Sequence, residues 1–194
     1  MLDSPATERP PRWRAWLPRI LAVAVLAGAG VLALVRLEVI GGPTEAERAA
    51  TVTAELNDRM TTTLEKLPTE GHEGHGTAGT AKGRTVCGTR VYGYEPENAK
   101  TAEAVKTVYG FHFCAVAEPG GVWDFATKLV APLIMRLDRE PPAFEMAAAT
   151  ETTSYQERIN QIFPPRYQRD AREKALEPEA MADLRARYEA AVKG

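Results

Sequence analysis

The chain has few of the side chains that perform nucleophilic catalysis. Its only serines are Ser4 and Ser154, and its only cysteines are Cys87 and Cys114. Serine and cysteine hydrolases need such a nucleophile beside a base. We expect Ser154 to cap a helix and the two cysteines to be bonded to each other. We therefore do not expect a hydrolase of either class. Carboxylates near the second predicted hairpin leave open an enzyme of another type, a third alternative.

An excess of positive charge is also missing. Residues 1–19 carry four arginines against Asp3 and Glu8, a charge of +2, and residues 20–35 carry none. Since the whole chain has a net charge of −2, residues 36–194 carry −4. Binding to nucleic acid depends on neutralising phosphates with lysine and arginine, so this composition predicts no nucleic-acid partner.

A long apolar run near the start is the strongest signal in the chain. Residues 20–35 read ILAVAVLAGAGVLALV, without a charged side chain. With apolar flanks as far as Ile40 the run reaches the length that crosses a bilayer, and Trp13 and Trp16 suit the membrane interface. We predict a cytoplasmic tail (residues 1–19), a transmembrane helix (residues 20–40) and an external remainder, because the arginine-rich side stays in the cytoplasm. The expected location is the plasma membrane.

The alternative to a retained anchor is a cleaved secretory signal, which also has a basic start and an apolar middle. The small residues typical of a cleavage site, Ala27 and Ala29, lie inside the run rather than at its end, and no cysteine follows that would carry a lipid. The pairs Ala24 with Gly28 and Ala29 with Ala33 match the small-xxx-small pattern. A homo-oligomer formed through the transmembrane helix is therefore one expected partner, beside the bilayer itself.

The remaining residues predict one external α+β domain, residues 44–194. Apolar residues at intervals of three and four between residues 44 and 67 indicate a helix that covers a sheet. Residues 69–83, rich in glycine, threonine and charge, indicate a flexible loop. Valine-rich and aromatic stretches predict strands at residues 84–94, 105–117, 128–137 and 143–148. One helix is expected after Ser154, where Glu157 completes a capping box, with Pro164 and Pro165 ending it, and a last helix is expected at residues 178–192. A helix on about four antiparallel strands, closed by C-terminal helices, resembles cystatin-like and NTF2-like domains in shape, which implies no activity.

The two cysteines agree with a strand register. If Tyr94 lies opposite Thr107, then Cys87 lies opposite Cys114, and Tyr92, Arg90 and Gly88 face aromatic residues on a core-like side. Two external cysteines predict one structural disulfide, Cys87–Cys114. A redox-active pair is the alternative, but such cysteines usually lie close in sequence.

Two histidines, His72 and His75, lie in the motif EGHEGHG. Imidazole binds zinc, copper and nickel, and Glu70 or Glu73 would add oxygen ligands. The two histidines form only half of a site, so the alternative is a solvated linker in which they are incidental. We expect no cofactor.

A partner-binding patch is predicted in the stretch IFPPRYQRDAREK, from Phe163, Arg166, Tyr167 and Arg169, since aromatic residues and arginine dominate interface hot spots. The alternative is a connector that packs Phe163 and Tyr167 into the core. The function expected from the sequence is that of a single-pass, membrane-anchored, non-catalytic module that binds a partner or helps to assemble an envelope complex. The alternative is a membrane-tethered carrier of a small ligand or metal.

Overall fold

The computed structural model describes residues 42–67 and 83–194. Residues Ala46–Gly194 form one compact unit, separate from Met1–Glu45. The predicted cytoplasmic tail and membrane span lie outside the described residues, as does the 69–83 loop apart from Gly83. Within the described ranges, no helix combines the length and the apolar character needed to cross a bilayer.

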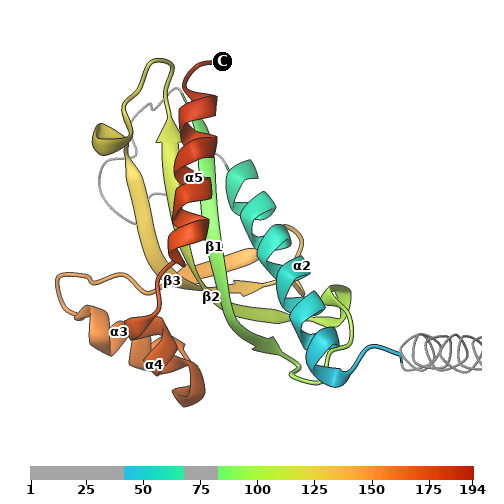
Figure 1. Ribbon diagram of the computed structural model, residues 1–194. Helices are drawn as coiled ribbons and strands as arrows, with labels where there is room; N and C mark the ends of the chain where they lie inside the picture. The colour runs from blue at the N-terminus through green and yellow to red at the C-terminus, as the bar shows by residue number, and fades with distance from the viewer. Residues whose placement is uncertain (1–41, 68–82) are drawn as a thin grey trace, which may run out of the picture. The chain divides into compact units, whose positions relative to one another are not determined.

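The domain is an antiparallel sheet of four strands between two layers of helices (Figure 1). The strand order is β1-β2-β3-β4, in chain order: β1 (Arg84–Glu95), β2 (Thr107–Ala117), β3 (Lys128–Arg136) and β4 (Ala143–Met146). The helices are α2 (Glu45–Lys66), α3 (Tyr155–Ile162), α4 (Pro165–Glu173) and α5 (Pro178–Ala191). Two short 3-10 turns are η3 (Ala102–Ala104) and η4 (Trp123–Phe125). The predicted α+β class and helix-on-sheet arrangement are confirmed.

Helix α2 packs on one face of the sheet through a single apolar stripe. Val52, Leu56, Met60 and Leu64 recur every fourth residue and are each 1% exposed. They form one core cluster with alternate residues of the strands: Cys87, Tyr94, Val108, Cys114, Leu133 and Met135. Burial of each such side chain stabilises by about 1.5–3 kcal/mol, so this stripe fixes α2 to the sheet.

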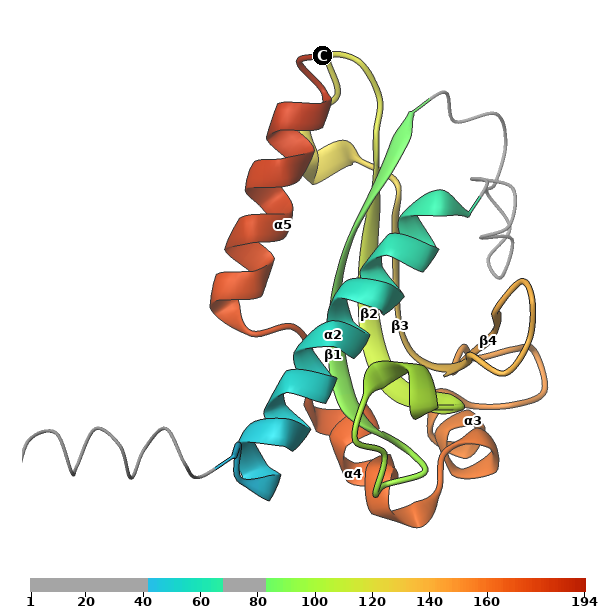
Figure 2. The ribbon, with the colours of Figure 1, turned by 90° about the vertical axis from the view of Figure 1, so that its right-hand side faces the viewer.

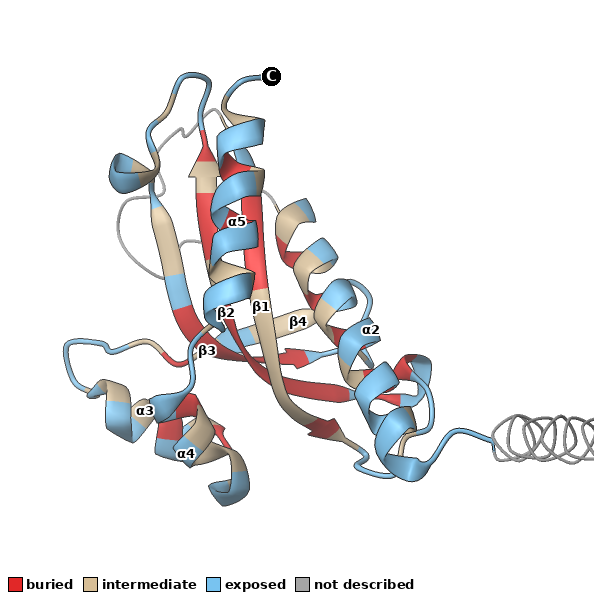
Figure 3. Ribbon diagram, in the orientation of Figure 1, coloured by how far each residue is buried: buried red, intermediate tan, exposed pale blue. Residues whose placement is uncertain are grey.

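The opposite face of the sheet is covered by the C-terminal helices, as the second view shows (Figure 2). Leu184 and Tyr188 of α5 pack on Val86 and Ala115. The α3–α4 pair packs on Tyr109 and Ile134 through a second cluster, which includes Ile159, Phe163 and Ala171. Buried residues therefore line both sides of the central strands (Figure 3).

Both faces of the sheet are buried, although the sequence led us to expect one core-like face. The aromatic face containing Tyr109 and Phe113 was expected to be the core-like side, yet the disulfide face under α2 is buried as deeply. Strand β2 is buried along almost its whole length. Strands enclosed on both faces read as continuous apolar runs rather than as alternating patterns, which is what residues 107–117 show.

The predicted register is correct over the first part of the β1–β2 pair and wrong after it. Cys87 lies opposite Cys114, and Thr89 lies opposite His112. The register then shifts between Val91 and Gly93, so that Glu95, not Tyr94, lies opposite Thr107. One extra residue, Tyr92, has been accommodated as a β-bulge, which bends the strand locally.

Two local signals mark the starts of α3 and α4: a capping box and a proline at the first helical position. The capping box is confirmed, because the Ser154 hydroxyl accepts the Glu157 amide at 3.3 Å and the Glu157 carboxylate accepts the Ser154 amide at 2.8 Å. Pro164 and Pro165 were expected only to end a helix. Pro165 instead occupies the first position of α4, where its fixed φ and missing N–H are tolerated.

Candidate functional site

The predicted partner-binding patch lies where α3 and α4 meet the sheet, and half of it is in the core. Phe163 is 2% exposed, and its ring centroid lies 6.0 Å from that of Tyr109. Tyr167 stacks on Tyr109 at 4.7 Å and lies directly over Gly93, where a Cβ atom would collide with its ring. These two aromatic rings hold the α3–α4 segment on the sheet. This is the alternative given above, in which the segment is a connector that packs Phe163 and Tyr167 into the core.

The two arginines of the predicted patch remain nearer the surface. Arg166 pairs with Glu95 at 2.6 Å and with Glu97 at 2.5 Å, and its guanidinium lies 4.9 Å from the Tyr167 ring centroid. The Arg169 side chain is 78% exposed and approaches Asp170 only at 3.9 Å. Both carboxylate contacts of Arg166 would have to be displaced before it could bind an anionic group on a partner, so Arg169 is the more available of the two.

Two tyrosines near this patch act as hydrogen-bond donors. The Tyr109 hydroxyl donates to Glu95 at 3.0 Å, and the Tyr92 hydroxyl donates to the Lys174 carbonyl at 2.6 Å. Burial and then the bond to Glu95 raise the pKa of Tyr109 to about 12. Burial, with a smaller contribution from Tyr155, also raises the pKa of Tyr92. Both shifts favour the protonated phenol, which is the form that donates these bonds. The Tyr92 bond ties β1 to the end of α4, and the Tyr109 bond links β2 to β1.

The disulfide lies in the core cluster between α2 and the sheet, under the last turns of α2. Cys87 and Cys114 are bonded, with their Cα atoms 4.1 Å apart and exposures of 0% and 3%. Burial on this scale denies a thiol or a substrate access to either sulfur. The predicted disulfide is confirmed.

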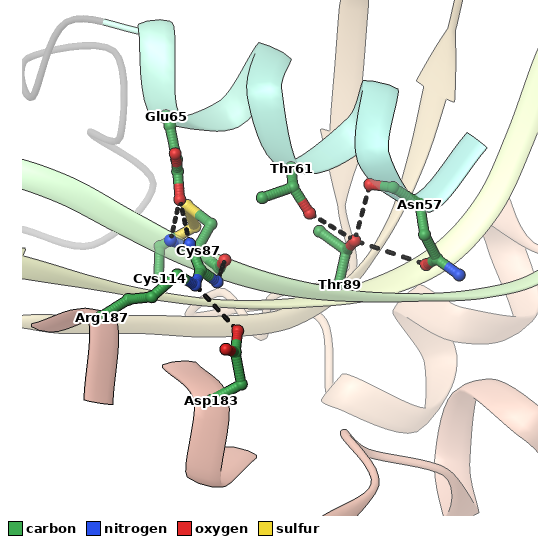
Figure 4. Close-up of polar contacts among 8 residues, drawn as sticks. All are labelled: Asn57, Thr61, Glu65, Cys87, Thr89, Cys114, Asp183 and Arg187. Atoms are coloured by element: carbon green, nitrogen blue, oxygen red, sulfur yellow. Dashed lines mark hydrogen bonds and ion pairs between the residues drawn. A yellow bond between two sulfur atoms is a disulfide. The ribbon is translucent and has the colours of Figure 1, made fainter. Parts of the chain in front are cut away.

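Side chains from α2 and α5 cover the free edge of β1 at the disulfide (Figure 4). Glu65 accepts the Cys87 amide at 2.9 Å and pairs with Arg187 at 2.8 Å. Arg187 also donates to the Cys87 carbonyl at 2.5 Å and pairs with Asp183 at 2.9 Å. The Glu65–Arg187 clasp thus occupies backbone groups of an edge strand that would otherwise be open to pairing with another chain.

A second set of contacts continues this cover along β1. Asn57 accepts the Val91 amide at 3.0 Å through its side-chain oxygen, and its backbone carbonyl accepts the Thr89 hydroxyl at 3.1 Å. Thr61 lies 2.8 Å from the same hydroxyl. The edge of β1 is therefore blocked here against the addition of another strand, and at the other edge of the described sheet β4 is only four residues long.

The loop between β2 and β3, residues 118–127, carries the most exposed aromatic residue among the described residues. Phe125 is 89% exposed and Val122 is 58% exposed, and within residues 42–67 and 83–194 the only other exposed large apolar residue is Val130, at 46%. Both loop residues belong to the turn around η4, in which the Phe125 amide donates to the Val122 carbonyl at 3.0 Å. We call residues 118–127 the β2–β3 loop.

Trp123 holds the β2–β3 loop on the domain. Its ring stacks on Phe113 at 5.9 Å and meets Tyr188 edge-on at 5.2 Å. Lys128 lies over the same ring, 5.1 Å from its centroid, and its ammonium group donates to the Trp123 carbonyl. The Gly120 amide donates to the Val192 carbonyl at 3.0 Å, which ties the loop to the end of α5. Phe125 is therefore presented to solvent from a braced turn.

Sequence reasoning missed this loop as a candidate site. The segment EPGGVWDFAT shows turn residues around three large apolar residues, Val122, Trp123 and Phe125. That combination was the available signal, since short loops usually carry polar residues. Which of the three side chains is buried depends on Phe113 and Tyr188, which are distant in sequence.

The histidines of the predicted metal site, His72 and His75, lie outside the described residues. Within the part of the chain that the structure describes, no three His, Cys, Asp or Glu side chains gather in a way that could hold a metal ion. Of the carboxylates around the second hairpin, Glu145 pairs with Arg158 at 2.5 Å. Comparison of the chain with family models, with curated proteins and with solved structures finds no match.

Proposed function

We propose that this protein is a single-pass membrane protein whose external domain binds a partner protein, without catalysis, and contributes to an assembly in the cell envelope. The anchor in this proposal is the apolar run at residues 20–40, and the domain begins a few residues later, at α2. The single observation that carries partner binding is the 89% exposure of Phe125 beside Val122 on the braced β2–β3 loop.

Physical reasoning supports this use of the loop. An exposed phenylalanine ring loses the favourable burial that aromatic residues normally gain, and large aromatic residues are enriched at the centres of interfaces. The hydrogen bonds at Trp123 and Gly120 fix the backbone around Phe125 and leave its ring uncovered. A rigid knob of this kind needs little further ordering when it binds, which favours affinity.

The test compares complexes of the full chain extracted from its native membranes. The wild type and a Phe125→Ser/Val122→Ser double variant are purified in a mild detergent, and the proteins that copurify with each are quantified by mass spectrometry. Val130→Ser is the matched control, because Val130 is also an exposed apolar residue but lies on β3 outside the loop. We expect at least one partner protein to copurify in constant proportion with the wild type and with the control, and to be lost from the double variant.

The substituted side chains are exposed, so all variants should keep the thermal midpoint of the wild type within about 2 °C. Recovery of the wild-type chain without any companion in constant proportion would contradict the proposed function. Retention of the companion by the double variant would leave partner binding in place but remove the loop from it.

A further inference from the structure

On the basis of the proposed function, we propose that Phe125 inserts into an apolar pocket of another protein in the aqueous phase, at the end of the domain far from the point where the chain enters it. An exposed aromatic loop could instead contact the bilayer or a second copy of this chain.

The place of the loop within the domain bears on the choice between a protein partner and the bilayer. Helix α2 runs antiparallel to β1, because Asn57 contacts Val91 and the later Glu65 contacts Cys87. From Ala46, the first residue of the domain, to Asn57 the helix spans about 16 Å at 1.5 Å per residue. From Val91 to Arg84, which lies opposite Ala117 at the root of the loop, the strand spans about 23 Å at 3.3 Å per residue.

Together these lengths place the β2–β3 loop about 40 Å from the start of α2 along the domain. Figures 1 and 2 agree that η4 and the first turn of α2 lie at opposite ends. The headgroup layer of a bilayer adds only roughly 5–8 Å on each side of the hydrocarbon core. If the proposed span ends just before α2, the loop reaches that bilayer only when the long axis of the domain lies along the membrane surface, whereas a partner in water sets no such condition.

The surface area that the loop can bury favours a pocket on another protein over a second copy of this chain. One buried aromatic ring contributes roughly 150–250 Å². A standard interface needs about 800 Å² from each partner. Two convex loop tips that meet across a twofold axis would bury little beyond Phe125 and Val122. A concave partner would also enclose the flanks of the loop, including Gly121 and Asp124, and so gain the missing area.

Electrostatics at the loop are consistent with this choice. Glu118 and Asp124 are its only charged residues, both acidic, and the neighbouring Lys128 is turned inward onto Trp123. A loop that carries two carboxylates beside its apolar knob gains nothing from an anionic lipid surface. A neutral or basic rim around the partner's pocket fits it better.

The test uses site-specific photo-crosslinking of the full chain in living cells. p-Benzoylphenylalanine replaces Phe125 in one variant and Val130 in a matched control. We expect a protein adduct at position 125 that is much weaker at position 130. Peptide mapping of the adduct should place the crosslink in an apolar pocket of the partner. The adduct alone does not support the proposal unless the affinity measurement agrees.

That measurement uses the purified partner and the full chain in detergent. Phe125→Ser should weaken binding by about 30-fold or more, the range of an interface hot spot, and Val130→Ser by less than about threefold. Phe125→Leu, which restores an apolar side chain, should recover most of the loss.

Other outcomes overturn the inference in distinct ways. A lipid adduct at position 125 assigns the loop to the bilayer, and an adduct with the chain's own sequence assigns it to a second copy. Protein adducts at other surface positions but not at 125 reject the loop while the proposed function stands. Absence of a protein adduct at 125 and at every other exposed position tested rejects both.

Discussion

The Glu65–Arg187 clasp gives the sharpest prediction about stability. Arg187→Met keeps an unbranched side chain of similar helix propensity but removes three polar contacts, to Glu65, Asp183 and the Cys87 carbonyl. A hydrogen bond to a charged group contributes about 1.5–3 kcal/mol when it is buried. The Arg187 side chain is 38% exposed and Glu65 is 19% exposed, so water screens part of this energy. We expect a loss of about 1–2 kcal/mol.

The assay is thermal unfolding of the full chain in a mild detergent, followed by near-ultraviolet circular dichroism. For a domain of this size, that loss lowers the midpoint by roughly 3–7 °C. Arg185→Met is the matched control on the same helix. Arg185 pairs only with Glu189, and both side chains are about half exposed. Such a surface pair contributes about 0.3–0.5 kcal/mol, so the control should shift the midpoint by less than about 2 °C.

A double-mutant cycle with Glu65→Gln isolates the contact between the two side chains. We expect a coupling energy of about 1 kcal/mol, since residues within one polar network are not additive. Equal shifts for Arg187→Met and Arg185→Met, or strictly additive losses in the cycle, would refute the reasoning that the clasp holds α5 and α2 on the edge of β1.

Three further predictions concern the core, the disulfide and alkaline pH. Leu184→Ala should cost about 2–5 kcal/mol, because Leu184 is 0% exposed, and the partly exposed Met181→Ala clearly less, as urea unfolding would show. Cys87→Ser with Cys114→Ser should lower the free energy of unfolding by about 3–4 kcal/mol in the chain-entropy model, and a loss under 1 kcal/mol would dispute that model here. Because the pKa of Tyr109 is raised from 10.0 to about 12, its stabilisation is complete below pH 10 and is lost as the pH rises through 12. Tyr109→Phe should show a smaller decrease in thermal midpoint between pH 9 and pH 11, and an unchanged decrease would contradict the assignment.

The sequence predicted most strongly those elements that local pattern determines. The apolar stripe from Val52 to Leu64 identified α2 because each side chain on it meets the same face of the sheet. The cysteine pair supported the correct register for the first part of the β1–β2 pair, as far as Val91, since two cysteines on neighbouring strands can bond when they lie opposite each other. The serine and glutamate of the capping box located the start of α3.

The errors came from features that depend on contacts between distant segments. The bulge at Tyr92 places both Tyr92 and Gly93 toward α4, where Tyr167 occupies the space above the glycine. No local pattern reports that contact. Pro165 was read as a helix stop, although the first position of a helix tolerates proline equally well.

The candidate site was harder to predict than the fold. Phe163 and Arg169 lie six residues apart in one apolar and basic segment, yet one is buried and the other exposed. Which residue faces the core is decided by the angle at which α3 and α4 lie on the sheet. Phe125 escaped notice for the same reason, since its exposure follows from Trp123 being the residue that packs on Phe113 and Tyr188.

The central claim is that residues 20–40 hold the chain in a membrane, with the domain on the outer side. The most direct measurement is protease accessibility of a tag placed after Gly194, in intact cells or spheroplasts that express the full chain. The account predicts that the tag is digested from outside while the chain stays with the membranes after an alkaline carbonate wash. A tag that is protected until the membrane is permeabilised, or a chain released into the wash, would contradict it.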